Sequence, residues 1–149
     1  MRRLGAGSAV QVVLVALTFA VFACSGDGGS PRATTPARVR APVRDLSASA
    51  TEFEFNQSQW TVPAGEMVTI NFANRGTIAH EWVVLKHGSH IDSEKAFREE
   101  MVLFEVEALP EGQTTSQQFS IKEPGSYQFV CALEGHFEAG MEGTLTVVN

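Results

Sequence analysis

The stretch Val68-Thr69-Ile70-Asn71-Phe72 alternates apolar and polar side chains without a break. Successive side chains of a β-strand point to opposite faces, so a period of two places Val68, Ile70 and Phe72 together on one face. This pattern is typical of a half-buried strand with Thr69 and Asn71 in solvent. The stretch therefore predicts a β-strand that packs one face against a core.

The same alternation recurs on both sides of this stretch, from Thr51 to the C-terminus. Clusters of Gly, Pro and Asn separate the alternating runs and mark turns. Many short strands with regular turns are typical of an antiparallel sandwich or barrel, so we predict an all-β domain for residues 51–149. The further alternating positions are Phe53 and Phe55; His80, Trp82 and Val84; Phe119 and Ile121; Tyr127, Phe129 and Cys131; Leu145 and Val147.

One segment has a helical period instead. Phe97, Met101 and Phe104 fall at positions i, i+4 and i+7, which lie on one face of an α-helix. The pattern predicts one short helix over about residues 93–103, inserted between strands. We expect its apolar stripe to pack on the sandwich and its acidic face to lie in solvent.

The loop between the last two predicted strands holds the residues with metal chemistry. It reads Cys131-Ala132-Leu133-Glu134-Gly135-His136-Phe137-Glu138-Ala139-Gly140-Met141. A second imidazole, His80, lies 51 residues before Cys131, at the start of a predicted strand. Two His and one Cys in a trigonal arrangement, with a weak axial Met, are the ligand set of blue-copper electron-transfer sites. We therefore predict one mononuclear copper ion bound by His80, Cys131, His136 and Met141.

With these residues, the chain resembles the cupredoxin family over about residues 52–149. The spacing Cys-x4-His-x4-Met is most similar to the auracyanin and rusticyanin branch, and the turn Asn74-Arg75-Gly76 before His80 also fits the family. The resemblance implies a Greek-key β-sandwich that holds Cu(I) or Cu(II). It implies that Cys131 supplies a short copper–thiolate bond, that His80 and His136 complete the equatorial plane, and that Met141 is a long axial ligand.

The resemblance also implies how electrons enter and leave. His136 is expected to be the exposed ligand, surrounded by an apolar collar and then by an acidic rim that steers a basic partner. The collar would consist of Leu133, Phe137 and Ala139, and the rim of Glu134, Glu138 and Glu142.

Glu81 departs from the family pattern. In plastocyanin and azurin an Asn follows the first His ligand and helps to tie the two ligand segments together. An ionised carboxylate near the metal would favour Cu(II) and lower the reduction potential, whereas a protonated one can still donate a hydrogen bond.

The N-terminus has the features of an export signal. Arg2 and Arg3 precede an apolar run over residues 9–23, which predicts a signal peptide at residues 1–23. The run is shorter than the ~20 residues that a membrane span needs. The small residue Ala23 before Cys24 resembles a bacterial lipobox, so we predict that Cys24 is lipidated. Plain cleavage and an uncleaved anchor are the alternatives.

Residues 24–50 are predicted to be a lipidated N-terminus followed by a disordered linker. The segment is rich in Pro and Gly and has few large apolar residues, so it cannot offset its ordering entropy by burial. Together with the signal, it predicts an extracytoplasmic domain, in the periplasm or on the outer face of the cell membrane, held there by a lipid anchor.

The charge of the chain limits its partners. There are 17 acidic and 11 basic residues, and from Asp45 onward 16 acidic residues face only five basic ones, a net charge of −11. Such a surface argues against nucleic-acid binding and favours basic proteins or cations.

A disulfide between Cys24 and Cys131 is an alternative to a metal-binding role for Cys131. It would leave the spacing of His136 and Met141 unexplained.

These observations predict a one-electron carrier, monomeric and without enzymatic turnover, that serves redox proteins such as cytochromes or oxidases. A copper carrier or tolerance protein on the same fold is the main alternative. A structural or signalling β-sandwich protein that retains the metal ligands without a redox role is a third class of function. Zinc is less suited than copper, because structural zinc prefers four strong ligands.

Overall fold

The structure is a computed structural model that describes residues 40–149. The predicted signal peptide, Cys24 and the linker up to residue 39 lie outside the described residues. Within residues 40–149, no helix has the length and hydropathy needed to cross a membrane.

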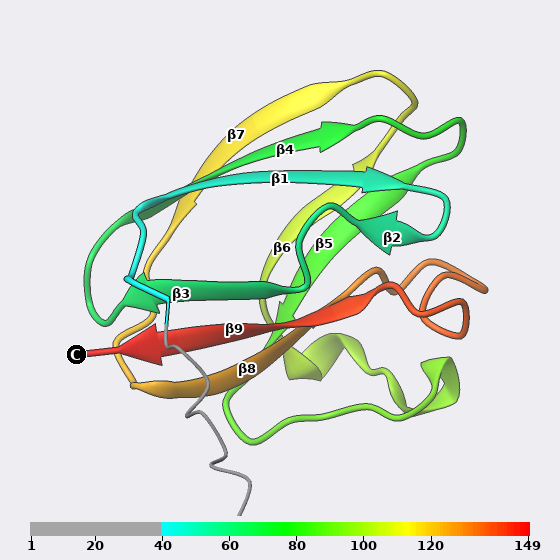
Figure 1. Ribbon diagram of the computed structural model, residues 1–149. Helices are drawn as coiled ribbons and strands as arrows, with labels where there is room; N and C mark the ends of the chain where they lie inside the picture. Colours follow the sequence, from blue (N-terminus) through cyan, green and yellow to red (C-terminus); the bar gives the residue numbers. More distant parts are fainter. Residues whose placement is uncertain (1–39) are drawn as a thin grey trace, which may run out of the picture. The chain divides into compact units, whose positions relative to one another are not determined.

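Two β-sheets form the domain and lie face to face as two layers (Figure 1). The β-sandwich that the sequence predicts is confirmed. The first sheet has the order β2 (Glu54–Phe55), β1 (Asp45–Thr51), β4 (Val68–Asn74) and β7 (Thr114–Phe119). The second has the order β3 (Gln59–Pro63), β9 (Glu142–Val148), β8 (Gly125–Val130), β5 (His80–Leu85) and β6 (Val102–Leu109).

The main core lies between the sheets. Val68, Ile70 and Phe72 of β4 are buried, as their alternation predicts. They share one cluster with Trp82 of β5 and Phe129 of β8, so both sheets contribute large side chains to it. Burying side chains of this size stabilises the domain by about 1.5–3 kcal/mol each before entropy is counted.

Two strand pairs are parallel, which corrects the expected antiparallel arrangement. Strand β1 runs parallel to β4, and β3 runs parallel to β9. Alternation in a sequence determines which side chains face the core, but it does not determine the neighbour of a strand or its direction.

The domain begins earlier than the sequence suggests. Residues 45–50 belong to β1, where Leu46, Ala48 and Ala50 are buried, so the linker predicted for residues 24–50 is too long at its C-terminal end. The alternation of Phe53 and Phe55 does not form one strand either, because a turn separates β1 from β2. Small Ser and Ala side chains give β1 little signal of its own, and pairing with β4 stabilises it.

The helix predicted for residues 93–103 is wrong. The structure has two single 3₁₀ turns, η1 (Glu94–Ala96) and η2 (Glu99–Met101), separated by extended backbone at Phe97 and Arg98. Phe97 and Met101 pack on a second cluster on the outer face of the second sheet, whereas Phe104 belongs to β6 and packs on the main core. The apparent helical period therefore arises from residues that serve two different surfaces.

Candidate metal centre

The structure brings together three of the four predicted ligand residues. His80, Cys131 and His136 each offer one ligand atom, and these atoms all lie within 4.8 Å of one another. All three side chains are buried. The Cys131 Sγ atom lies 3.2 Å from Nδ1 of His136, and the rings of His80 and His136 have centroids 4.9 Å apart. Residues 51 positions apart in the chain thus form one compact group.

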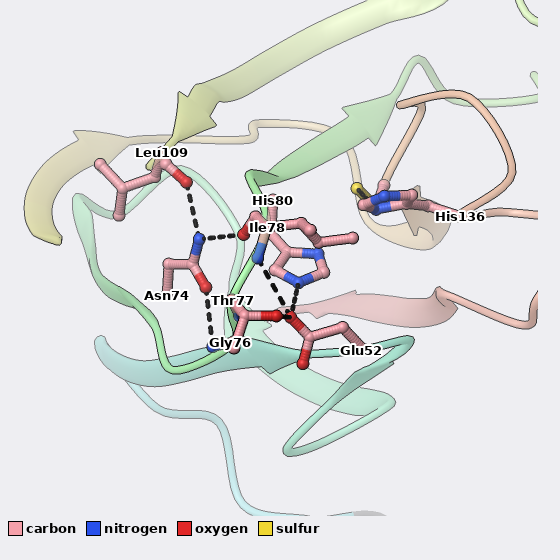
Figure 2. Close-up of polar contacts among 9 residues, drawn as sticks. Glu52, Asn74, Gly76, Thr77, Ile78, His80, Leu109 and His136 are labelled. Carbon is pink, nitrogen blue, oxygen red and sulfur yellow. Dashed lines mark hydrogen bonds and ion pairs between the residues drawn. The ribbon is translucent and has the colours of Figure 1, made fainter. Parts of the chain in front are cut away.

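The loop before His80 is held by the side chain of Asn74. Its Nδ2 donates to the carbonyl oxygens of Ile78 (2.7 Å) and Leu109 (2.8 Å), and its Oδ1 accepts from the Gly76 N–H at 2.9 Å (Figure 2). Asn74 is almost fully buried, so these bonds are shielded from water. They fix the path of the chain into β5, whose first residue is His80.

Glu52, which no motif in the sequence marks, holds the same loop from the other side (Figure 2). Its Oε1 accepts hydrogen bonds from the N–H and hydroxyl of Thr77 and from the N–H of Ile78. The same oxygen lies 3.9 Å from Nε2 of His80. The hydrogen bonds from the loop, with Thr77 first, lower the pKa of Glu52 to about 2.

Backbone hydrogen bonds close the loop that carries Cys131 and His136. The N–H of Cys131 donates to the carbonyl of Met141 at 3.0 Å, and the N–H of Met141 donates to the carbonyl of His136 at 3.1 Å. Gly135 and Gly140 have φ values of 81° and 102°, which side chains other than glycine rarely adopt. The side chain of Met141 is fully buried, and its role as the axial ligand stays a prediction.

Glu81 joins the two ligand segments. Its Oε1 accepts a hydrogen bond of 2.8 Å from the backbone N–H of Ala132, the residue after Cys131. Burial raises the pKa of Glu81, which the bond from Ala132 partly opposes. The carboxylate therefore ties the two ligand segments together, which is the role that the resemblance implies for the family's Asn, and it does so with a carboxylate oxygen as the acceptor.

Burial also sets the protonation of the three ligands. It lowers the pKa of both His80 and His136, so both imidazoles are neutral at neutral pH. It raises the pKa of the Cys131 thiol to about 11. Both ring nitrogens of His80 are buried without a hydrogen-bond partner in the described part of the chain. A bound metal would satisfy such a nitrogen, and the neutral imidazoles and soft sulfur suit copper.

The sequence itself identifies the family. Residues 43–148 match the model for copper binding proteins of the plastocyanin/azurin family. The chain belongs to this family. His80, Cys131 and His136 of this cupredoxin are therefore positioned to bind one copper ion, as in blue copper proteins.

Several known proteins are similar to the chain. Auracyanin-A from Chloroflexus aurantiacus is 25% identical over 158 positions, which cover 93% of this chain and 94% of that protein. The copper-resistant cuproprotein CopI from Rubrivivax gelatinosus is 32% identical over 106 positions, 62% of this chain and 59% of CopI. The structure of dithionite-reduced auracyanin from Roseiflexus castenholzii shares the fold, with a TM-score of 0.64 at 22% identity over 73% of this chain and 100% of that chain.

The surroundings of His136 in this cupredoxin differ from the expected collar. His136 is only 6% exposed, and Phe53 from the β1–β2 turn packs edge-on against its ring at a centroid distance of 5.1 Å. Phe137 is 8% exposed and packs in the second cluster, so it is not part of an apolar surface. Leu133 is half-buried and Ala139 is exposed. Phe53, which is 41% exposed, is the aromatic side chain beside His136, the position expected for Phe137. Only the tertiary fold brings Phe53 to this position.

Proposed function

We propose that this protein is a type 1 copper protein that carries single electrons outside the cytoplasm. The observation that carries the proposal is the buried group of His80, Cys131 and His136, with ligand atoms within 4.8 Å of one another. Copper, when bound there, supplies a Cu(II)/Cu(I) couple that exchanges one electron.

The hydrogen bonds around the ligands support rapid electron exchange. Asn74 and Glu52 hold the segment before His80, and Glu81 ties the start of β5 to Ala132. Because these contacts fix the ligands from several sides, the site reorganises little when its charge changes. We propose Met141 as the fourth, axial ligand, since its backbone is bonded to both Cys131 and His136.

Electrons are proposed to pass through the edge of His136. The exposed side chains of Phe53 and Ala139 and the half-buried Leu133 give this end of the sandwich an apolar surface. The exposed Glu134 and Glu138 add negative charge, which would steer a basic redox protein such as a cytochrome or an oxidase.

The chain is proposed to act as a monomer without substrate turnover. The three ligands are buried, and a fourth from Met141 would leave no coordination position for a substrate. We propose further that residues 1–23 are a signal peptide and that lipidated Cys24 anchors the mature chain to the membrane. Mass spectrometry of the membrane-extracted protein tests this: acyl chains on an N-terminal Cys24 support the anchor, and their absence contradicts it.

A second candidate is a copper carrier or tolerance protein, in which the metal is the cargo. The similarity to the copper-resistant cuproprotein CopI favours this alternative. A carrier must release copper to a recipient, whereas an electron carrier must retain copper in both oxidation states.

One experiment separates the two functions. Purified protein is loaded with copper and cycled between ascorbate and ferricyanide, while the visible band and the bound copper are measured in the presence of a competing chelator. We expect the band to disappear and return with the copper retained, as electron transfer requires. Ready loss of copper to the chelator in either state would support the carrier, and the lack of any intense band would contradict a type 1 site.

A further inference from the structure

The second ring nitrogen of His80 faces a charged group. His80 is fully buried, and neither of its ring nitrogens has a hydrogen-bond partner among residues 40–149. The Nε2 atom lies 3.9 Å from Oε1 of Glu52, with the carboxylate on the side of the ring away from His136 (Figure 2). Since Nε2 faces the carboxylate, Nδ1 is the nitrogen left for the metal.

Glu52 reaches His80 from another sheet and is held in place by the loop. It lies in the turn between β1 and β2, whereas His80 begins β5 of the opposite sheet. One oxygen of Glu52 accepts three hydrogen bonds from Thr77 and Ile78, so the carboxylate is fixed relative to the segment that leads into His80.

Gly76 keeps the space that this contact needs. A Cβ atom at Gly76 would lie 2.5 Å from Oε1 of Glu52 and 2.9 Å from Nε2 of His80. Its φ is not positive, so the absence of a side chain, and not the backbone conformation, is what the position requires. A glycine therefore allows the carboxylate and the imidazole to approach.

We propose that Glu52 is a positioning residue for the copper site: it anchors the His80 loop and places a negative charge beside the His80 ring, which stabilises Cu(II) over Cu(I). At 3.9 Å the contact is longer than a hydrogen bond, so the carboxylate acts on the ring through its charge. A carboxylate behind a metal-bound His makes the imidazole a stronger donor, which favours the more highly charged metal ion. The inference rests on the proposed type 1 copper site.

The test compares the reduction potentials of Glu52→Gln and Glu54→Gln in the full chain loaded with copper. The Gln oxygen can still accept from Thr77 and Ile78, so Glu52→Gln removes the charge and keeps the anchor. Glu54 is exposed in β2 and makes no hydrogen bond or ion pair to the loop in the described part of the chain, so its variant controls for net charge. Voltammetry, visible spectra and copper content are measured for both.

We expect Glu52→Gln to keep its copper and its visible band and to raise the potential, whereas Glu54→Gln changes it much less. We take a change of about tenfold in the relative affinity for Cu(II) and Cu(I) as the expected size of the effect, which is the lower end of the roughly 10–100-fold changes in metal affinity that residues behind a ligand produce. For one electron this equals about 59 mV. Equal potentials in the two variants would overturn the inference, and the absence of the band in the unmodified protein would instead overturn the proposed copper site.

A second variant decides the question if Glu52→Gln fails to bind copper. Gly76→Ala retains both Glu52 and His80 but places a methyl group between them, so we expect it to raise the potential as well. A Gly76→Ala protein with copper bound and an unchanged potential would overturn the role of the contact.

Discussion

The carboxylate of Glu81 accepts a hydrogen bond of 2.8 Å from the backbone N–H of Ala132. The bond joins the residue after one ligand, His80, to the residue after another, Cys131. A position that departs from the family pattern thus keeps the structural link between the two ligand segments, because a carboxylate oxygen accepts from the same N–H that an amide oxygen would.

Two substitutions of Glu81 distinguish the effect of its hydrogen bond from the effect of its charge. Glu81→Ala leaves the Ala132 N–H without its partner, so we expect the free energy of unfolding of the metal-free protein to fall by about 1–3 kcal/mol. Glu81→Gln retains an acceptor oxygen and should stay within about 1 kcal/mol of the original. Urea unfolding measures both values, and equal losses in the two variants would show that the hydrogen bond is not what stabilises this segment.

The thiolate of Cys131 should be responsible for the colour. We expect Cys131→Ser to abolish the intense visible band, because a hydroxyl is a poor ligand for copper in a site that needs a soft donor. Absorption spectra and metal analysis check this, and thermal unfolding of the metal-free variant shows whether the fold persists. An intense band in the serine variant would contradict the assignment of Cys131.

Replacing Met141, the proposed axial ligand, should change the reduction potential and leave copper bound. Leu has a similar volume, so Met141→Leu should fold and retain copper in the trigonal group of His80, Cys131 and His136. Loss of a weak thioether donor should raise the reduction potential, which voltammetry measures. A variant that loses all its copper would show that Met141 is a principal ligand or a structural support and not a weak axial one.

The buried amide of Asn74 should contribute strongly to stability. Asn74→Ala removes the three buried hydrogen bonds that the side chain makes to the backbone of Ile78, Leu109 and Gly76, so we expect the free energy of unfolding to fall by about 2–4 kcal/mol. Asn71 lies in the same strand and is exposed, so Asn71→Ala is a matched control that should change stability by less than about 0.5 kcal/mol. Denaturant unfolding of the metal-free proteins compares the two, and similar losses would contradict the role of Asn74.

Copper binding should release one proton near neutral pH. The raised pKa of Cys131, about 11, means that the folded metal-free protein holds the thiol proton, whereas the lowered pKa values of His80 and His136 leave both imidazoles neutral. From about pH 7 to about pH 10 the affinity for Cu(I) should therefore rise about tenfold per pH unit.

Anaerobic calorimetry in buffers of different protonation enthalpy measures this release. The matched Cys131→Ser variant should release no proton in the same window. An affinity of the unmodified protein that does not depend on pH would contradict a protonated thiol in the metal-free state.

Local patterns in the sequence were sufficient for much of the architecture. The alternation around Ile70 and Phe72 predicted the half-buried strand β4. The residue types His80, Cys131 and His136 predicted the group that the structure brings together, whereas the role of Met141 stays a prediction. The helical period of Phe97, Met101 and Phe104 led to a wrong prediction of a helix. Periodicity indicates that residues are buried, but it does not indicate which surface they pack against. Strand β1 was missed because its Ser and Ala residues bury little area of their own.

The amino-acid sequence by itself determined the all-β class and the His and Cys residues that meet at the metal centre, because these depend on side-chain chemistry and on spacing between near neighbours. Only the tertiary structure decided what surrounds the ligands. Glu52 faces His80, and Phe53 covers His136, because the β1–β2 turn crosses the end of the opposite sheet. Such contacts join residues that are far apart in the chain. The sequence around either residue therefore does not predict that the two lie close together in the fold.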